Sequence, residues 1–319
     1  MSQRVVYFNG EFVSESEARV SIFDSALMFG DMAFEMTRSF GGKLFRLRDH
    51  LERLYASLKL MEVDCGLTID EMETITEDTF ERNRPTEADD VDWQIMHDVS
   101  RGPLSIYESV FPEGCQPTVS INCWPLIKHM SGVGTLYDRG IDIVLVPQLA
   151  VPAHLIDPKA KTRSRLHYQI ANLQAARMGN GLWPCLLDPD GFLAEGTGWN
   201  VFLVKDGTVY SPEPRNMLRG VSRAVTMELA GELGIPVVET NLGRYEALQA
   251  DEIFTTGTTS SIIWVRSFEG QTVSDGKPGP VHQRLLEAWK QRAGIDFVAQ
   301  AKSYQGRLDA WERAQRTGR

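Results

Sequence analysis

The sequence predicts an α+β protein with two domains, a small N-terminal α/β domain and a larger, strand-rich C-terminal domain. The chain has 319 residues, which suits two domains or one large one. Apolar residues alternate in short runs around turn dipeptides, and stretches with helical spacing lie between these runs. Both patterns lapse between residues 126 and 137. We therefore expect a change of domain there.

The N-terminal part alternates helix and strand signals. Asn9-Gly10 and Gly41-Gly42 each lie between two alternating runs and predict hairpins. Asp49 with Glu52, and Thr68 with Glu71, have the spacing of capping boxes and predict the starts of two helices. Two further strands are expected at 91–101 and 117–126. We therefore expect a first domain at 1–126, a glycine-containing linker at 127–137, a second domain at 138–300, and a polar tail at 301–319 that forms a surface helix or a frayed end.

The C-terminal part is richer in strand signals. Asp190-Gly191 and Asp206-Gly207 predict two hairpins. A helix is expected after Gly220, with Gly234 just past its end. The other expected elements are strands at 141–146, 236–239, 252–256 and 262–268, and a helix near 281–289.

Composition limits the possible partners and location. The formal charge is −10, which argues against nucleic acid or an anionic membrane as the main partner. The N-terminus lacks the apolar core of a signal peptide, and no run approaches 18 apolar residues. The four cysteines have no C-x-x-C spacing, so we expect no metal site and free thiols in a reducing cytoplasm.

Lys161 is the first candidate for chemistry, because a fixed amine of lowered pKa can attack a carbonyl group. It precedes an apolar stripe at helical spacing, formed by Leu166, Ile170, Leu173 and Ala176. Lys161 is therefore expected at the entry of a helix. An ordinary exposed lysine is the alternative.

Four other places have residues suited to anions or proton transfer. Glu195 ends a strand before a glycine turn and is either a cleft acid or a solvent-facing turn carboxylate. The start of the helix after Gly220 and the loop 257–261 offer N–H and hydroxyl groups to an anion, although Ser222 could simply be an N-cap. Arg53 can clamp a phosphate or form an i,i+4 surface ion pair.

Six stretches of the chain form a recognisable series: YFNGEFV (7–13), FDSALMFGDMAFEMTRSFGGKLFRLRDHLERL (23–54), KTRSRLHYQIANLQA (161–175), 186–212, 216–237 and 247–270. In this order they resemble the class IV aminotransferases, which include branched-chain and D-amino-acid aminotransferases and 4-amino-4-deoxychorismate lyases. The resemblance runs from Tyr7 to Trp289. It implies the fold-type IV architecture, the cofactor pyridoxal 5'-phosphate (PLP), and a homodimer.

The resemblance also implies a role for each matched residue. Lys161 would bind PLP as a Schiff base and move a proton, and Glu195, 34 positions later, would pair with the ring nitrogen. The remaining cofactor contacts would come from Arg53, Val221, Ser222 and Thr258. Substrate contacts would come from Phe34, Arg38 and Thr259. For Arg38 and Phe34, a solvent-facing strand residue and a core residue are the respective alternatives.

Several positions depart from the family pattern and bear on the substrate. Branched-chain enzymes carry a tyrosine where this chain has Leu166, and D-amino-acid enzymes carry an Arg-x-His pair where it has Ile106 and Glu108. Trp199 is bulky where small residues are usual, and Ser261 replaces a frequent glutamate.

These features favour a transaminase that moves an amino group between an amino acid, branched-chain among the candidates, and a 2-oxo acid. A PLP lyase acting on aminodeoxychorismate is the alternative, favoured by Arg165-Leu166. A non-catalytic binding protein with the same fold, suggested by Trp199, is a distant third.

Overall fold

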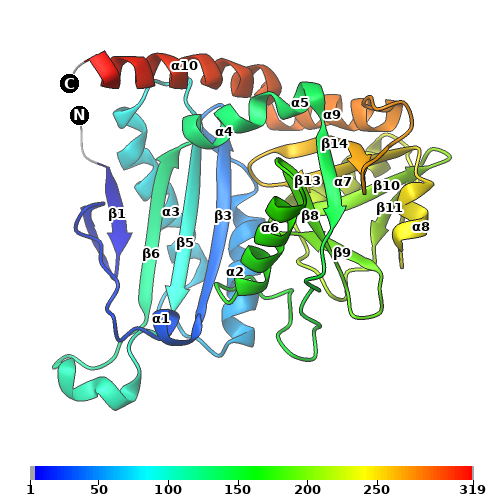
Figure 1. Cartoon of the computed structure of the whole chain (residues 1–319). Helices are drawn as coiled ribbons and strands as arrows, with labels where there is room; N and C mark the ends of the chain where they lie inside the picture. Colours follow the sequence, from blue (N-terminus) through cyan, green and yellow to red (C-terminus); the bar gives the residue numbers. More distant parts are fainter. Residues whose placement is uncertain (1–3, 318–319) are drawn as a thin grey trace. The chain divides into compact units, whose positions relative to one another are not determined.

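The computed structural model describes residues 4–317, with their side chains as far as residue 308. The chain forms two compact units, and both combine helices with a sheet (Figure 1), which confirms the predicted α+β class. The first unit runs through Leu126 and also contains Ala160–Arg165; the second contains Ile127–Lys159 and the chain from Leu166 onward. Lys161 is therefore part of the first unit, within a short segment whose flanking stretches in the sequence belong to the second.

The first unit contains an antiparallel sheet of six strands among the described residues, in the order β2-β1-β6-β5-β3-β4. Both predicted hairpins are present, and Asn9 and Gly10 turn the first one with φ values of 49° and 98°. The strands are β1 (Val5–Phe8), β2 (Glu11–Ser14), β3 (Met32–Phe40), β4 (Lys43–Leu44), β5 (Trp93–Ser100) and β6 (Thr118–Pro125).

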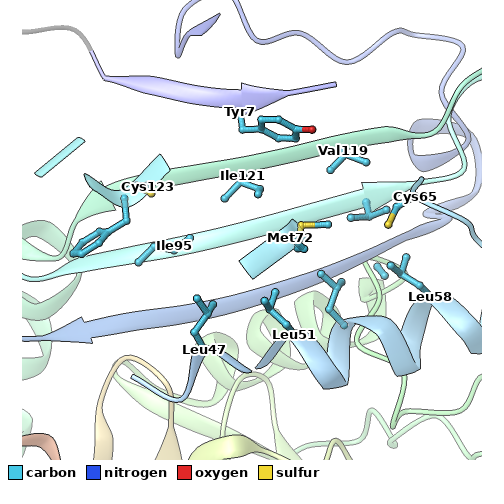
Figure 2. Close-up of a cluster of buried hydrophobic side chains, with 14 of the residues drawn as sticks. Tyr7, Leu47, Leu51, Leu58, Cys65, Met72, Ile95, Val119, Ile121 and Cys123 are labelled. Atoms are coloured by element: carbon cyan, nitrogen blue, oxygen red, sulfur yellow. The ribbon is translucent and has the colours of Figure 1, made fainter. Parts of the chain in front are cut away.

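Helices α2 (Leu47–Leu60) and α3 (Ile69–Asn83) pack their apolar side chains against this sheet. Figure 2 shows Leu47, Leu51 and Leu58 of α2 directed at the strands, with Met72 of α3 in the same buried cluster. Burial of each such leucine stabilises the fold by about 1.5–3 kcal/mol. The unit also contains α1 (Ser25–Phe29) and two 3-10 turns, η1 (Arg84–Thr86) and η2 (Ser105–Val110).

The two predicted capping boxes have opposite outcomes. Thr68 caps α3: its Oγ1 accepts from the N–H of Glu71, and Glu71 accepts from the N–H of Thr68, as predicted. The prediction for Asp49 is wrong, because α2 begins two residues earlier, after Arg46 in the left-handed conformation (φ 52°). Asp49 instead lies in the first turn of α2, where its negative charge interacts favourably with the helix dipole and stabilises the helix.

The second unit is organised around a mixed sheet, with main order β12-β11-β10-β13-β14-β7-β8-β9 among the described residues; β15 pairs with β14. The β11–β12, β14–β7 and β7–β8 pairs are parallel and the other pairs antiparallel. Both predicted Asp-Gly turns connect antiparallel neighbours. The strands are β7 (Ile141–Leu145), β8 (Leu182–Leu187), β9 (Leu193–Gly196), β10 (Asn200–Lys205), β11 (Thr208–Pro212), β12 (Val237–Thr240), β13 (Glu252–Gly257), β14 (Ser261–Phe268) and β15 (Gln271–Thr272).

Helices α5 (Leu136–Arg139), α6 (Leu166–Met178), α7 (Val221–Glu232) and α9 (Pro280–Ala293) pack against strands of this sheet. The helix after Gly220 is confirmed as α7, and the helix near 281–289 is confirmed as α9. The remaining helices are α4 (Ile127–Gly134), α8 (Arg244–Leu248) and α10 (Phe297–Thr317).

Residues 127–137, predicted as a linker with no clear period, contain the helices α4 and α5. Helix α10, which includes most of the predicted tail, packs along α4 (Figure 1). A Cβ on Gly134 would lie 2.8 Å from the carbonyl oxygen of Ala301, so a glycine is needed for this close approach. Gly134 therefore allows α4 and α10 to pack closely.

Helix α6 is present where the apolar spacing predicted a helix. Its buried residues are Tyr168, Ala171 and Ala175, which pack with residues of β7, β8 and β9. Leu166 and Leu173, from the apolar stripe, are 72% and 49% exposed. The apolar stripe therefore lies on the outer face of this helix, and small residues form its packed face.

Candidate active site

In the first unit, the segment that carries Lys161 extends the sheet at the edge of β3. The N–H of Phe34 donates to the carbonyl of Lys161 at 2.9 Å, and the N–H of Arg163 donates to the carbonyl of Met32 at 2.8 Å. Ala33 and Thr162 form the β-bridge between these two bonds. The sequence placed Lys161 at a helix entry, but its backbone is fixed by strand pairing, and α6 begins only at Leu166.

Two further contacts fix Lys161. Its N–H donates to Oγ of Ser57 at 3.0 Å, and Ser57 donates to the carbonyl of Arg53 at 2.8 Å. Its Nζ lies 4.7 Å from the centroid of the buried Phe34 ring, within cation–π range. The guanidinium carbons of Arg163 and Arg165 lie 3.9 and 5.3 Å from the same centroid. Lys161 is therefore a half-buried amine in a cationic neighbourhood, which contradicts the ordinary exposed lysine.

Arg53 is held by a buried carboxylate. Its Nε and Nη2 donate to the two oxygens of Glu35 at 2.8 and 2.7 Å, and Nδ1 of His50 lies 2.9 Å from Glu35 Oε1. Burial opposes ionisation of Glu35, but Arg53 and His50 outweigh it and hold its pKa well below the usual value. Burial also lowers the pKa of His50. The i,i+4 surface pair considered for Arg53 is wrong, because its partner lies on β3.

Arg38 is also buried, with 1% of its surface exposed, so the solvent-facing alternative is wrong. Its Nε donates to the carbonyl of Ser39 at 3.1 Å, and its guanidinium carbon lies 4.0 Å from the Phe40 ring centroid. Alternation along β3 puts Arg38 on the same face as Phe34. The first unit therefore brings together Arg53, Lys161 and Phe34, with Arg38 further along the same strand.

In the second unit, Glu195 lies on β9 and is 3% exposed, so the solvent-facing turn carboxylate is wrong. The hydroxyl of Tyr168 donates to its Oε1 at 2.6 Å, and the N–H of Leu218 donates to the same oxygen at 3.1 Å. Donors to a carboxylate favour its charged form. A buried acid fixed in this way is suited to pairing with a positive group.

The start of α7 lies beside this acid. Nδ2 of Asn200 donates to the carbonyl of Leu218 at 3.0 Å, and a Cβ on Gly220 would lie 2.3 Å from Asn200 Oδ1. Gly220 is the N-cap, and no side chain from the described residues caps the helix there. The N-cap role considered for Ser222 is therefore wrong. The first N–H groups of α7 can serve an anion.

The loop 257–261 follows β13 and lies close to the Gly198–Trp199 segment, which comes shortly after Glu195 in the sequence. A Cβ on Gly257 would lie 3.2 Å from the carbonyl oxygen of Gly198, and Thr258 and Thr259 are half-buried. Among the described atoms, Oγ1 of Thr256 and Oγ of Ser261 are buried without a hydrogen-bond partner. Buried hydroxyls need partners, so these two, with the uncapped start of α7, fit a phosphate-bearing cofactor.

Trp199 has a packing role in the second unit. A Cβ on Gly196 would lie 1.9 Å from the Trp199 indole, and the Trp199 and Trp183 ring centroids are 5.9 Å apart. Trp199 is 8% exposed. The large Trp199 side chain therefore fits because Gly196, the residue after Glu195, has no side chain. Trp199 was the feature that suggested a non-catalytic protein, so this alternative loses its support.

Sequence reasoning missed Glu35, Ser57, Tyr168 and Leu218. The sequence held a signal for two of them. Glu35 is an acid between the apolar residues Phe34 and Met36 of a strand, and Tyr168 shares a helical face with Ala171 and Ala175. Ser57 and the N–H of Leu218 gave no such signal, because their partners are distant in the sequence.

The described residues also hold no group of three or more His, Cys, Asp or Glu placed for a metal ion. None of the described helices has the length and apolar character to cross a bilayer.

Comparisons with known proteins identify the family of this chain. Residues 32–268 match the family model described as amino-transferase class IV. The chain is 34% identical over 287 residues to a putative branched-chain-amino-acid aminotransferase of Methanocaldococcus jannaschii, covering 89% of this chain and 95% of that protein. It is similar to the solved branched-chain aminotransferase of Escherichia coli, with a TM-score of 0.81, 29% identity, and 91% and 94% of the two chains covered.

A third similarity is to the T.th. branched-chain aminotransferase solved with N-(5'-phosphopyridoxyl)-L-glutamate, with a TM-score of 0.80, 25% identity, and 96% and 98% coverage. The fold and these similarities define a fold-type IV enzyme. The chain belongs to the class IV aminotransferase family and is an aminotransferase.

Proposed function

We propose that this chain moves an amino group between a branched-chain amino acid and a 2-oxo acid with PLP as its cofactor. The observation that carries the proposal is the buried Glu195, which accepts a hydrogen bond from the N–H of Leu218 in the segment that leads into the uncapped start of α7. Thr256 and Ser261 add buried hydroxyls without a hydrogen-bond partner among the described atoms. Bound PLP supplies an electron sink for the substrate Cα. The branched-chain preference is supported by the named relatives.

The residues have the following proposed roles. Lys161 would anchor the cofactor covalently, and its amine, once freed by the substrate, would take the proton from the substrate Cα and deliver it to the cofactor carbon. Glu195 keeps the ring nitrogen protonated. The phosphate is held by Arg53, Val221, Ser222 and Thr258. Phe34, Arg38 and Thr259 contact the substrate, with Arg38 offering a cation to a carboxylate.

The proposal is tested by reducing the purified protein with borohydride and mapping the product by mass spectrometry. We expect a pyridoxyl group on Lys161 in the wild type and none in Lys161→Ala. A matched control is Lys159→Ala, which removes the neighbouring lysine, paired with Asp157 at 2.9 Å, and should keep the adduct. An unmodified Lys161 in the wild type would overturn the proposal.

The substrate is tested by a donor screen that follows the visible absorbance of the bound cofactor. We expect L-leucine, L-isoleucine and L-valine to convert the cofactor to its amine form, and 2-oxoglutarate to reverse the change. Conversion only by D-amino acids would overturn the branched-chain assignment. Release of p-aminobenzoate and pyruvate from aminodeoxychorismate would show the alternative lyase activity, which Arg165-Leu166 favours.

We also propose a homodimer in the cytoplasm. Support for the dimer comes from the outward apolar residues Leu166, Ile170 and Leu173 of α6, since exposed apolar patches of this kind mark protein interfaces. Support for the location comes from the cysteines, all of which are free thiols. Light scattering after gel filtration should give twice the chain mass of 35.8 kDa, and Leu173→Glu should shift it toward the monomer. A wild-type mass of one chain would contradict the dimer.

A further inference from the structure

A short hydrogen bond to Glu195 comes from a residue to which the family resemblance gave no role. The Tyr168 hydroxyl donates to Glu195 Oε1 at 2.6 Å, and both residues are buried, with 9% and 3% of their surfaces exposed. The two side chains come from different elements, α6 and β9. The bond therefore depends on how this helix packs on its sheet.

We propose that Tyr168 is a positioning residue for Glu195, holding its carboxylate charged and correctly oriented for the cofactor's ring nitrogen. This inference rests on the proposed function, because the proposed function pairs Glu195 with the ring nitrogen of the cofactor. Tyr168 acts through Glu195 and has no direct part in the chemistry.

Several contacts fix the Tyr168 ring. It lies on the packed face of α6 with Ala171 and Ala175, in a cluster with Ala194, the residue before Glu195. The His167 ring lies 4.0 Å from the Tyr168 ring between centroids. A second bond ties the two elements together one turn further along α6, where Oγ1 of Thr197 donates to Asn172 Oδ1 at 2.9 Å. The hydroxyl is thus placed by rigid packing.

Two donors reach the same oxygen of Glu195 from different segments. Tyr168 approaches from α6 and the N–H of Leu218 approaches from the segment that leads into α7. Two donors on one oxygen restrict rotation of the carboxylate and stabilise its negative charge. A carboxylate that stays charged in a buried site is what protonation of a cofactor nitrogen requires. Loss of the hydroxyl should leave the acid present but less fixed.

The test compares Tyr168→Phe with wild type as PLP-loaded enzyme. The variant keeps the buried ring and removes one oxygen, so the packing of α6 is retained. We expect kcat about tenfold lower, the cost of one charge-assisted hydrogen bond, with KM changed less than about twofold. We also expect several-fold weaker PLP affinity and a shifted pH titration of the cofactor absorbance. Tyr245→Phe, which removes a hydroxyl from a 73% exposed tyrosine of the same unit, should match wild type in all four measurements.

A double-mutant cycle separates positioning from general structural damage. If Tyr168 acts through Glu195, adding Tyr168→Phe to Glu195→Gln should cause little further loss of PLP affinity or kcat, since coupled residues are not additive. Additive losses, or an apoprotein melting temperature that falls in parallel with affinity, would assign Tyr168 a merely structural role and overturn the inference.

The outcomes also distinguish this inference from the proposed function. A wild-type pyridoxyl adduct at Lys161, together with wild-type absorbance titration and PLP affinity in Tyr168→Phe, would overturn the role of Tyr168 and leave the proposed function intact. Absence of the adduct in the wild type would overturn both.

Discussion

The backbone N–H of Lys161 donates to the hydroxyl of Ser57 across 3.0 Å, although the two residues are 104 positions apart. Ser57 also donates to the carbonyl of Arg53 in the preceding turn of α2. One buried hydroxyl therefore links the proposed covalent anchor to the helix that carries the proposed phosphate clamp.

Replacement of Ser57 by alanine should damage both stability and turnover. The variant leaves the Lys161 N–H without its acceptor, which costs about 1–3 kcal/mol in the free energy of unfolding. We also expect a lower kcat, since the lysine is less firmly held. Urea unfolding and steady-state kinetics measure the two effects. The control is Thr74→Ala, whose exposed hydroxyl makes the same kind of bond to a carbonyl four residues earlier; equal losses in both variants would contradict the role of Ser57.

The Glu35–Arg53 pair should make stability depend on pH. The pKa of Glu35 is well below 4.5 in the folded protein, so its stabilising effect is complete above the unfolded-state pKa near 4.5 and is lost as pH falls through the folded-state value. Glu35→Gln should lose about 3–5 kcal/mol at pH 7, because Arg53 keeps a nearly buried charge without its partner.

Urea unfolding at a series of pH values checks this prediction. The wild type should lose stability below about pH 4.5 more steeply than Glu35→Gln. Glu15→Gln serves as the control, because it breaks an exposed pair with Arg4 and should cost under about 1 kcal/mol. Equal acid sensitivity of Glu35→Gln and wild type would show that Glu35 does not carry the effect.

Gly196 should tolerate no side chain. A Cβ there would lie 1.9 Å from the Trp199 indole, so Gly196→Ala should cost about 1–3 kcal/mol and disturb the adjoining Glu195. Gly198→Ala is the matched control, since nothing lies within 4 Å of its Cβ. Thermal melting compares the two variants. Trp199→Leu should partly restore Gly196→Ala, and similar melting of both alanine variants would refute the packing argument.

His282 should contribute a loss of stability in acid. Neither ring nitrogen has a hydrogen-bond partner among the described atoms, and burial lowers its pKa from 6.5 to about 3. Between those values the unfolded chain binds a proton that the folded chain does not, so stability falls as pH decreases, by on the order of 1.4 kcal/mol per unit. His282→Leu should remove this part of the slope in urea unfolding. The exposed His154→Leu should leave it unchanged, and an unaltered slope in His282→Leu would disprove the prediction.

The sequence by itself determined the elements whose signals are local. The turns at Asn9-Gly10 and Asp206-Gly207, the capping box of α3, and the helix after Gly220 all depend on residues within a few positions of one another. Resemblance to a family supplied the class of enzyme, which the comparisons confirm. The roles of Lys161 and the other site residues remain predictions.

Only the tertiary structure decided which partners distant residues meet. Helical spacing predicted α6 but could not tell that Tyr168 faces the sheet and Leu166 faces outward, because burial depends on the surface opposite the helix. The sequence also could not predict that Arg53 pairs with Glu35, because the helix and the strand that carry these residues are brought together only by packing of the core. Local signals fix backbone conformation, whereas the environment of a side chain depends on long-range packing.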